Sequence, residues 1–289
     1  MLVYCLPDES EGTMGEGRYS TLILLTLLLT LAGCQFERGG IQYGGSHSME
    51  PIGEAAVQPS VIALFAHPDD ETWISGTLAK FARHGVSVFP VYATSGEAGS
   101  DHSGQGLSGA ELAGVRELEA MAASHILGLE KPQFLRFPDG ELNQYPQEVV
   151  ERLTSLVELE KPVAVITFTE GGITDNQDHK TLNQIVSAHF NQLAGYFGVS
   201  YSRAGSLAMS ANKFDLDYEV AMPVEDAAVT IRVDVSEYRS LRVEAMASHR
   251  TQFTPTMIQA FSDYADSDSQ EEIIIADEQS RTVIIGLLK

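Results

Sequence analysis

Short apolar segments alternate with longer amphipathic ones between residues 60 and 195, and this alternation restricts the fold more than any other feature. The apolar segments at 61–65, 86–93 and 163–168 are typical of strands buried on both faces of a parallel sheet. A shorter strand is expected at 134–137. Apolar residues recur with helical spacing in the intervening and following segments, at 72–84, 108–127, 144–160 and 178–193.

Strands and helices in alternation predict an α/β fold: a Rossmann-like, mostly parallel sheet flanked by helices. Gly85, Gly128 and Gly195 are expected to end three of the helices. Beyond about residue 205 the pattern loosens into a C-terminal β/α portion, with a strand at 229–235 and a last helix at 235–248. The acidic stretch 263–278 is most simply a solvated surface.

The N-terminal region has the composition of an export signal. Thr21 to Leu31 is an apolar run too short to cross a bilayer, and Arg18 precedes it. The run ends in Leu-Ala-Gly-Cys at 31–34, which resembles the lipobox of bacterial lipoproteins. A plain secretory signal or a buried helix are the alternatives. Three acids lie upstream of Met14, so Met14 and Met1 both stand as candidate start residues.

The chain is thus expected to consist of three parts. Residues 1–33 are expected to be a lipoprotein signal peptide, residues 34–59 a flexible tether, and residues 60–289 the folded domain. A lipidated Cys34 would anchor the protein in the bacterial cell envelope, at the outer membrane or the outer face of the cell membrane. Nucleic acid is not an expected partner, because 40 acidic residues outnumber 18 Lys and Arg and give a formal charge of −22.

Two polar clusters follow predicted strands, where ligands bind in open α/β sheets. Residues 66–71 read Ala-His-Pro-Asp-Asp-Glu, and residues 171–179 end in Asp-Asn-Gln-Asp-His. His67 and Asp70, with one His from the second cluster, would supply the three ligands of a catalytic divalent metal. Asp69 would then remain free to act as a general base. The alternative is a helix N-terminus that these acids merely cap.

The first cluster and four later motifs resemble the PIG-L/LmbE family of zinc-dependent N-deacetylases. The matching residues occur in order between about 60 and 255, at 66–71, 94–99, 116–128, 137–142 and 242–252. This resemblance implies an LmbE-like fold, zinc ligands at His67, Asp70 and His179, and a catalytic base at Asp69. It implies hydrolysis of an acetamide by metal-activated water, on N-acetylglucosamine units of a glycan or glycolipid. The same ligand set also accepts Fe²⁺, Co²⁺ or Mn²⁺.

One position departs from the family pattern. Asn176 stands where the family usually has the first His of a His-Pro-Asp-His loop, and Asp178 is the counterpart of that loop's Asp. The family's His stabilises the oxyanion or protonates the leaving group, whereas an amide can donate a hydrogen bond but cannot carry a proton at neutral pH. His249 is the expected substitute acid. The rival hypothesis is a metal-dependent carbohydrate-binding lipoprotein with reduced or lost turnover.

Overall fold

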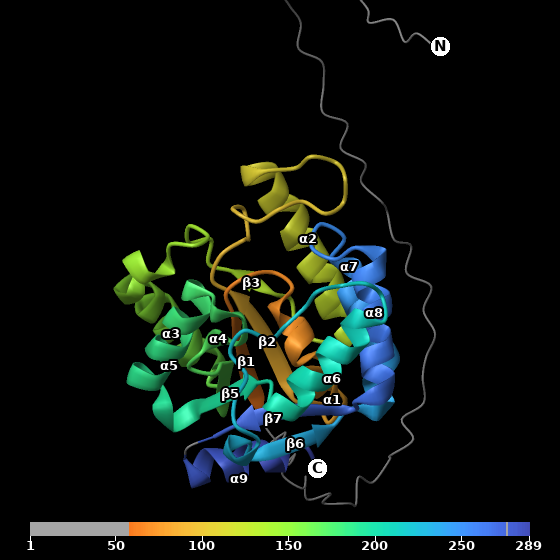
Figure 1. Cartoon of the computed structure of the whole chain (residues 1–289). Helices are drawn as coiled ribbons and strands as arrows, with labels where there is room; N and C mark the ends of the chain where they lie inside the picture. Colours follow the sequence, from red (N-terminus) through yellow and green to blue (C-terminus); the bar gives the residue numbers. More distant parts are fainter. Residues whose placement is uncertain (1–57, 276) are drawn as a thin grey trace, which may run out of the picture. The chain divides into compact units, whose positions relative to one another are not determined.

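The first strand lies in the interior of the sheet, next to its central strand, and all six of its residues are buried. The computed structural model describes residues 58–275 and 277–289; the expected signal peptide, Cys34 and the tether up to residue 57 lie outside them. Within these residues seven strands form one sheet, in the order β3-β2-β1-β4-β5-β7-β6 (Figure 1). The strands are β1 (Ser60–Phe65), β2 (Ser87–Tyr92), β3 (Gln133–Phe134), β4 (Ala164–Phe168), β5 (Ala194–Gly198), β6 (Ile231–Asp234) and β7 (Gln270–Ile274).

Helices cover both faces of this sheet. On one side α5 packs against β4 and β1, with α3 behind it; on the other, α1, α2, α7 and α8 pack against one another (Figure 1). The helices are α1 (Ser75–Arg83), α2 (Gly109–Leu127), α3 (Pro146–Glu160), α4 (Gly172–Asp175), α5 (Gln177–His189), α6 (Tyr201–Asn212), α7 (Arg239–Ser248), α8 (Pro255–Ser267) and α9 (Glu278–Leu287). Short 3₁₀ turns occur at η1 (Asp70–Trp73), η2 (Leu142–Gln144), η3 (Asn191–Leu193), η4 (Asp226–Ala228) and η5 (Ser236–Tyr238).

The predicted fold class is confirmed. The strands β3, β2, β1, β4 and β5 are parallel to their neighbours, and only β7 runs antiparallel, pairing with β5 and β6. Gly128 ends α2 with φ +76°, a conformation that glycine adopts without steric cost. Among the described residues no helix combines the length and the apolar character that crossing a membrane would require.

The strand order determines where a ligand can bind. β1 pairs with β2 on one side and with β4 on the other, and the chain builds the sheet outward from this pair in both directions. Loops that leave the carboxyl ends of β1 and β4 therefore diverge and open a crevice between them. Both polar clusters of the sequence lie in these two loops.

The second half of the chain differs from expectation in three ways. The predicted helix at 178–193 ends at His189, and residues 194–198 form strand β5. The helix at 239–248 is not the last one, because α8 and α9 follow it. Helix α6 also lies outside the expected elements, where the sequence pattern begins to loosen.

The acidic stretch 263–278 is not a solvated surface. It contains strand β7, in which the Glu271 and Glu272 side chains are almost fully buried. Glu271 accepts hydrogen bonds from the first backbone N–H groups of α1, at Gly76 (2.9 Å) and Thr77 (2.7 Å), and forms an ion pair with Arg242 (3.1 Å). These partners compensate for burial of the charge, so an acidic segment can occupy the interior.

Candidate active site

The turn after β1 fixes Asp70 through its own backbone. One carboxylate oxygen of Asp70 accepts hydrogen bonds from the N–H groups of Ala66 (3.1 Å) and His67 (2.7 Å). The second oxygen is left to face the crevice. A carboxylate held in this way has lost its rotational freedom before any ligand binds, which favours metal coordination.

The loop after β4 orients His179 in a similar way. Asn176 is the N-cap of α5, since its Oδ1 accepts hydrogen bonds from the N–H groups of Asp178 (2.7 Å) and His179 (3.4 Å). The His179 ring places Nδ1 2.8 Å from the carbonyl oxygen of Gly172. That carbonyl can only accept, so Nδ1 carries the proton and Nε2 presents a lone pair to the crevice.

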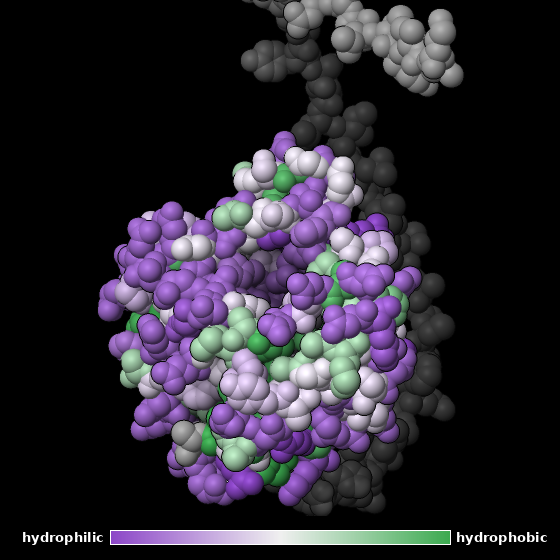
Figure 2. Space-filling view, in the orientation of Figure 1, coloured by the Kyte–Doolittle hydropathy of each residue, from purple (hydrophilic) through white to green (hydrophobic). Residues whose placement is uncertain are grey.

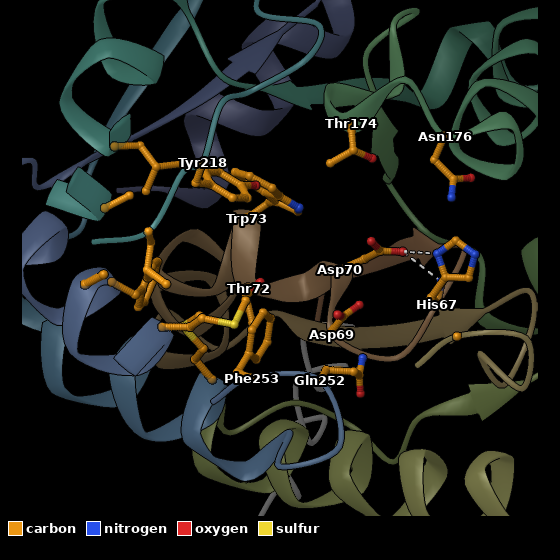
Figure 3. Close-up of a pocket in the computed structure, with 18 of the residues that line it drawn as sticks. His67, Asp69, Asp70, Thr72, Trp73, Thr174, Asn176, Tyr218, Gln252 and Phe253 are labelled. Carbon is orange, nitrogen blue, oxygen red and sulfur yellow. Dashed lines mark hydrogen bonds and ion pairs between the residues drawn. The ribbon is translucent and has the colours of Figure 1, made fainter. Parts of the chain in front are cut away.

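The two loops bring the three predicted ligands together. His179 Nε2 lies 3.2 Å from His67 Nδ1 and 3.1 Å from an Asp70 oxygen, and His67 Nδ1 lies 3.5 Å from the other Asp70 oxygen. A tetrahedral site with bonds of about 2.05 Å has edges of roughly 3.3 Å. The two edges that meet at His179 Nε2 already have about this length, and one donor atom from each of the three residues lies within 4.8 Å of the other two, so the residues fit a divalent cation. Figure 3 shows His67 and Asp70 from this cluster.

A second pair of carboxylates lies behind His67. Its Nε2 is 3.0 Å from Asp139 and 3.5 Å from Asp178. Asp178 is fully buried, and its two oxygens accept the N–H groups of Gly140 (2.8 Å) and Leu142 (3.1 Å), so it holds the turn that carries Asp139. These three side chains also lie close enough to hold a metal, but Asp178 has no free oxygen to offer. We therefore assign Asp139 and Asp178 to orienting His67.

The surrounding charges favour a cation in the crevice. Burial alone would lower the pKa of His67, but hydrogen bonds to Asp139, Asp178 and Asp70 raise it well above its usual range. For Asp70 the effect of burial is outweighed by the His179 and His67 imidazoles, and its pKa lies well below the usual range. The carboxylates thus stabilise one positive charge among them, which a proton or a metal cation can supply.

Asp69 differs from its neighbour Asp70. Its side chain lines the cavity, and no described residue donates a hydrogen bond to its carboxylate. The backbone of Asp69 has φ +116°, an uncommon conformation for a residue with a side chain. Burial and the adjacent Asp70 raise the pKa of the Asp69 carboxyl well above its usual range. A free carboxylate with a raised pKa beside the predicted metal ligands matches the requirements of a general base.

A buried network holds the Asp69 turn. Glu71 is fully buried and accepts hydrogen bonds from the Asp69 N–H (3.1 Å), the Tyr92 hydroxyl (2.9 Å) and His249 Nε2 (2.5 Å). His249 is itself fully buried and does not line the cavity. The structure therefore places His249 behind the turn at 67–71, and its expected role as substitute acid stays a prediction.

One cavity of about 640 Å³ contains most of these groups. His67, Asp69, Asp70, Asn176 and His179 line it, and Asp178 and His249 lie outside it. Figure 2 shows a hollow on this face of the molecule, hydrophilic in its upper part and bordered below by hydrophobic residues. The volume is typical of sites that enclose a whole small-molecule ligand.

Residues 62–190 match the family described as PIG-L: GlcNAc-PI de-N-acetylase. A 1D-myo-inositol 2-acetamido-2-deoxy-alpha-D-glucopyranoside deacetylase of Actinosynnema mirum is 30% identical over 237 residues, which cover 68% of this chain and 81% of that enzyme. The chain belongs to the PIG-L family. An enzyme of the same description from Saccharomonospora viridis is 28% identical over 228 residues, covering 67% of this chain and 85% of the relative.

A solved structure supports the fold of this PIG-L protein. The N,N'-diacetylchitobiose deacetylase of Pyrococcus horikoshii superposes with a TM-score of 0.55 at 24% identity, covering 74% of this chain and 82% of that one. The two proteins therefore share the arrangement of a mostly parallel sheet between helices. At this identity the likeness concerns the fold alone.

Sequence reasoning missed two residues of the site. Asp139 lies in the Pro-Asp-Gly turn, which served above only as a motif of the family. An acidic side chain directly before a turn glycine was the sequence feature that could have pointed to its contact with His67. Glu71 was counted among the clustered acids without a role of its own. The role of Glu71 was harder to predict, because no sequence motif indicates that it contacts Tyr92 and His249.

Proposed function

We propose that this PIG-L protein hydrolyses the acetamide of an N-acetylated amino sugar, using a divalent metal held by His67, Asp70 and His179. The observation that carries the proposal is the contrast between two adjacent carboxylates. Asp70 is anchored among the donor atoms of the candidate metal cluster, and Asp69 is unbonded and faces the cavity. A pure binding site does not require the second carboxylate. Zinc is the first candidate, and Fe²⁺, Co²⁺ or Mn²⁺ are alternatives.

A metal at this place would polarise the acetamide carbonyl and make a water molecule more acidic. Side chains of the protein carry out the remaining steps. Asp69 accepts the proton of the attacking water and returns it to the leaving amine. The Nδ2 group of Asn176 faces the cavity, because its Oδ1 caps α5, and it donates a hydrogen bond to the developing oxyanion. Asp139 keeps His67 in the tautomer that coordinates through Nδ1.

We expect the purified protein to contain close to one equivalent of divalent metal, and the His67→Ala variant to contain almost none. Loss of one of three protein ligands removes a corner of the site and leaves the other two too weak to retain the ion. Metal analysis after gel filtration measures this directly. Chelation should abolish release of free amine from N-acetylglucosamine glycosides, and added metal should restore it.

His102→Ala is the matched control, since His102 is an exposed histidine outside the cluster. It should keep the wild-type metal content. Equal metal content in His67→Ala and in the wild type would refute the ligand assignment. A metal-loaded protein that binds N-acetylated sugars and releases no amine would favour the carbohydrate-binding alternative, which the presence of Asn176 keeps open.

We also propose that the protein acts in the bacterial cell envelope, anchored through a lipid on Cys34. The proposal rests on the apolar run and the Leu-Ala-Gly-Cys sequence at 31–34. The wild type should partition with membranes, and Cys34→Ser should release it or leave it unprocessed. Fractionation and mass spectrometry of the N-terminus test this. Soluble wild-type protein whose mature N-terminus is not Cys34 would contradict lipidation. The two signals that stable anchoring takes are supplied if Cys34 carries more than one acyl chain.

A further inference from the structure

The cavity continues well beyond the residues that carry out the chemistry. Its far half is lined by apolar side chains of three helices and the segments between them: Leu207, Ala211, Met246, Met257, Ala260 and Phe261. Figure 3 shows the division, with His67, Asp69 and Asp70 on one side and Trp73, Tyr218 and Phe253 on the other. We call the far half the apolar chamber. With the acetamide of a bound sugar at the candidate metal cluster, a group attached to that sugar has room to extend into this chamber.

The two arginines in the chamber wall each contact a carboxylate. Arg203 contacts Asp268 at 3.1 Å, and Arg242 contacts Glu271 at 3.1 Å. Both guanidinium groups are buried, and Arg242 also lies against the Phe261 ring. Nη1 of Arg203 and Nε and Nη1 of Arg242 make no hydrogen bond of good geometry with any described residue. The carboxylates nevertheless offset both positive charges, so neither arginine offers an uncompensated charge to an anionic ligand. Asp217, which also lines the cavity, would repel one.

We propose that the apolar chamber binds the group attached to the amino sugar, and that this aglycone is neutral and apolar. This inference rests on the proposed deacetylase function. An apolar aglycone gains binding free energy in proportion to the surface that it buries, at about fourfold in affinity per methylene group. A highly hydroxylated or anionic aglycone would lose its hydration in the chamber with few polar partners to replace it.

Matched substrates test this chemistry directly. We would compare the methyl, n-hexyl and 5-carboxypentyl glycosides of N-acetylglucosamine by release of free amine. Burial of half of the five additional methylenes predicts a kcat/KM at least about 30-fold higher for the hexyl than for the methyl glycoside. The carboxypentyl glycoside, of similar length, should lose most of that advantage. Equal kcat/KM for the hexyl and methyl compounds overturns the proposal, and equal values for the hexyl and carboxypentyl compounds overturn the requirement for neutrality.

A pair of variants on α6 locates the effect. Leu207 lines the chamber, and Met209 on the same helix is exposed and lies outside it. Leu207→Asn should reduce the ratio of hexyl to methyl kcat/KM by about tenfold, because a polar amide replaces an apolar contact. Met209→Asn should leave that ratio and the basal activity unchanged. An equal ratio in the two variants would place the alkyl group elsewhere.

A binding measurement separates this inference from the proposed function. Trp73 is the only tryptophan of the chain and lines the cavity, so selectively excited tryptophan fluorescence reports on this site alone. If none of the glycosides is hydrolysed, the deacetylase proposal fails, and titration followed by Trp73 fluorescence still tests the chamber. Binding of the hexyl glycoside about 30-fold tighter than the methyl glycoside supports the chamber, and equal affinities overturn it.

Discussion

Replacing Asp69 by asparagine is expected to lower kcat by about 10²–10⁴-fold while the metal content stays near one equivalent. The substitution keeps the shape of the side chain and removes its capacity to accept a proton. Asparagine also tolerates the positive φ of this position, so the turn should persist. The measurements are release of amine from an N-acetylglucosamine glycoside and metal analysis of the same preparation.

Asp70→Asn is the matched comparison, one residue further along the same turn. It should lose both the metal and the activity, because Asp70 contributes an oxygen to the candidate cluster. Equal loss of metal in the two variants would show that ligand and base have been assigned the wrong way round. Wild-type turnover in Asp69→Asn would remove Asp69 from the mechanism.

Asn176→Ser is expected to lower turnover by about 10²–10³-fold and to leave thermal stability almost unchanged. Serine is as good an N-cap as asparagine, so α5 and His179 keep their support. Its short side chain carries no amide to donate toward the oxyanion. Asn176→Ala should lose turnover to a similar degree and also cost about 1 kcal/mol of stability through loss of the cap.

Turnover and thermal melting together separate the two roles of Asn176. Wild-type turnover in Asn176→Ser would mean that the side chain serves only as a cap. Asn176→His restores the family's usual imidazole and should preserve or raise turnover, since it can supply a proton that an amide cannot. His249→Ala should lower turnover without release of metal, through its contact with Glu71 or as an acid.

Local sequence patterns were sufficient to predict strands β1 to β4. β1 and β4 are buried throughout, consist mostly of apolar residues and are flanked by helices with clear periodicity, so their signal is contained in a few adjacent residues. Strand β5 was missed because its glycines resemble a helix stop. In the structure a Cβ at Gly195 would come within 2.9 Å of Ile284, so the glycine permits close packing. The need for glycine at this position thus comes from Ile284, which is far along the chain and could not be connected with Gly195 from the sequence.

In the site too, the residues that could be predicted are those placed by local sequence patterns, and the others depend on partners far along the chain. The turn at 67–70 and His179 could be placed together because both follow parallel strands. The buried position of His249 could not be predicted, since it depends on how α7 packs behind the first turn. Glu71 and Glu272 look like surface acids in the sequence, and only their distant partners make their burial favourable.

The contact between Glu271 and the start of α1 bears on how this protein can be divided. The family match ends at residue 190, but the carboxylate that caps α1 and neutralises Arg242 lies on β7, some eighty residues later. The helix immediately after the catalytic turn thus depends on the C-terminal third of the chain. We therefore expect residues 62–190 not to fold on their own, and a minimal folded fragment to extend at least through β7.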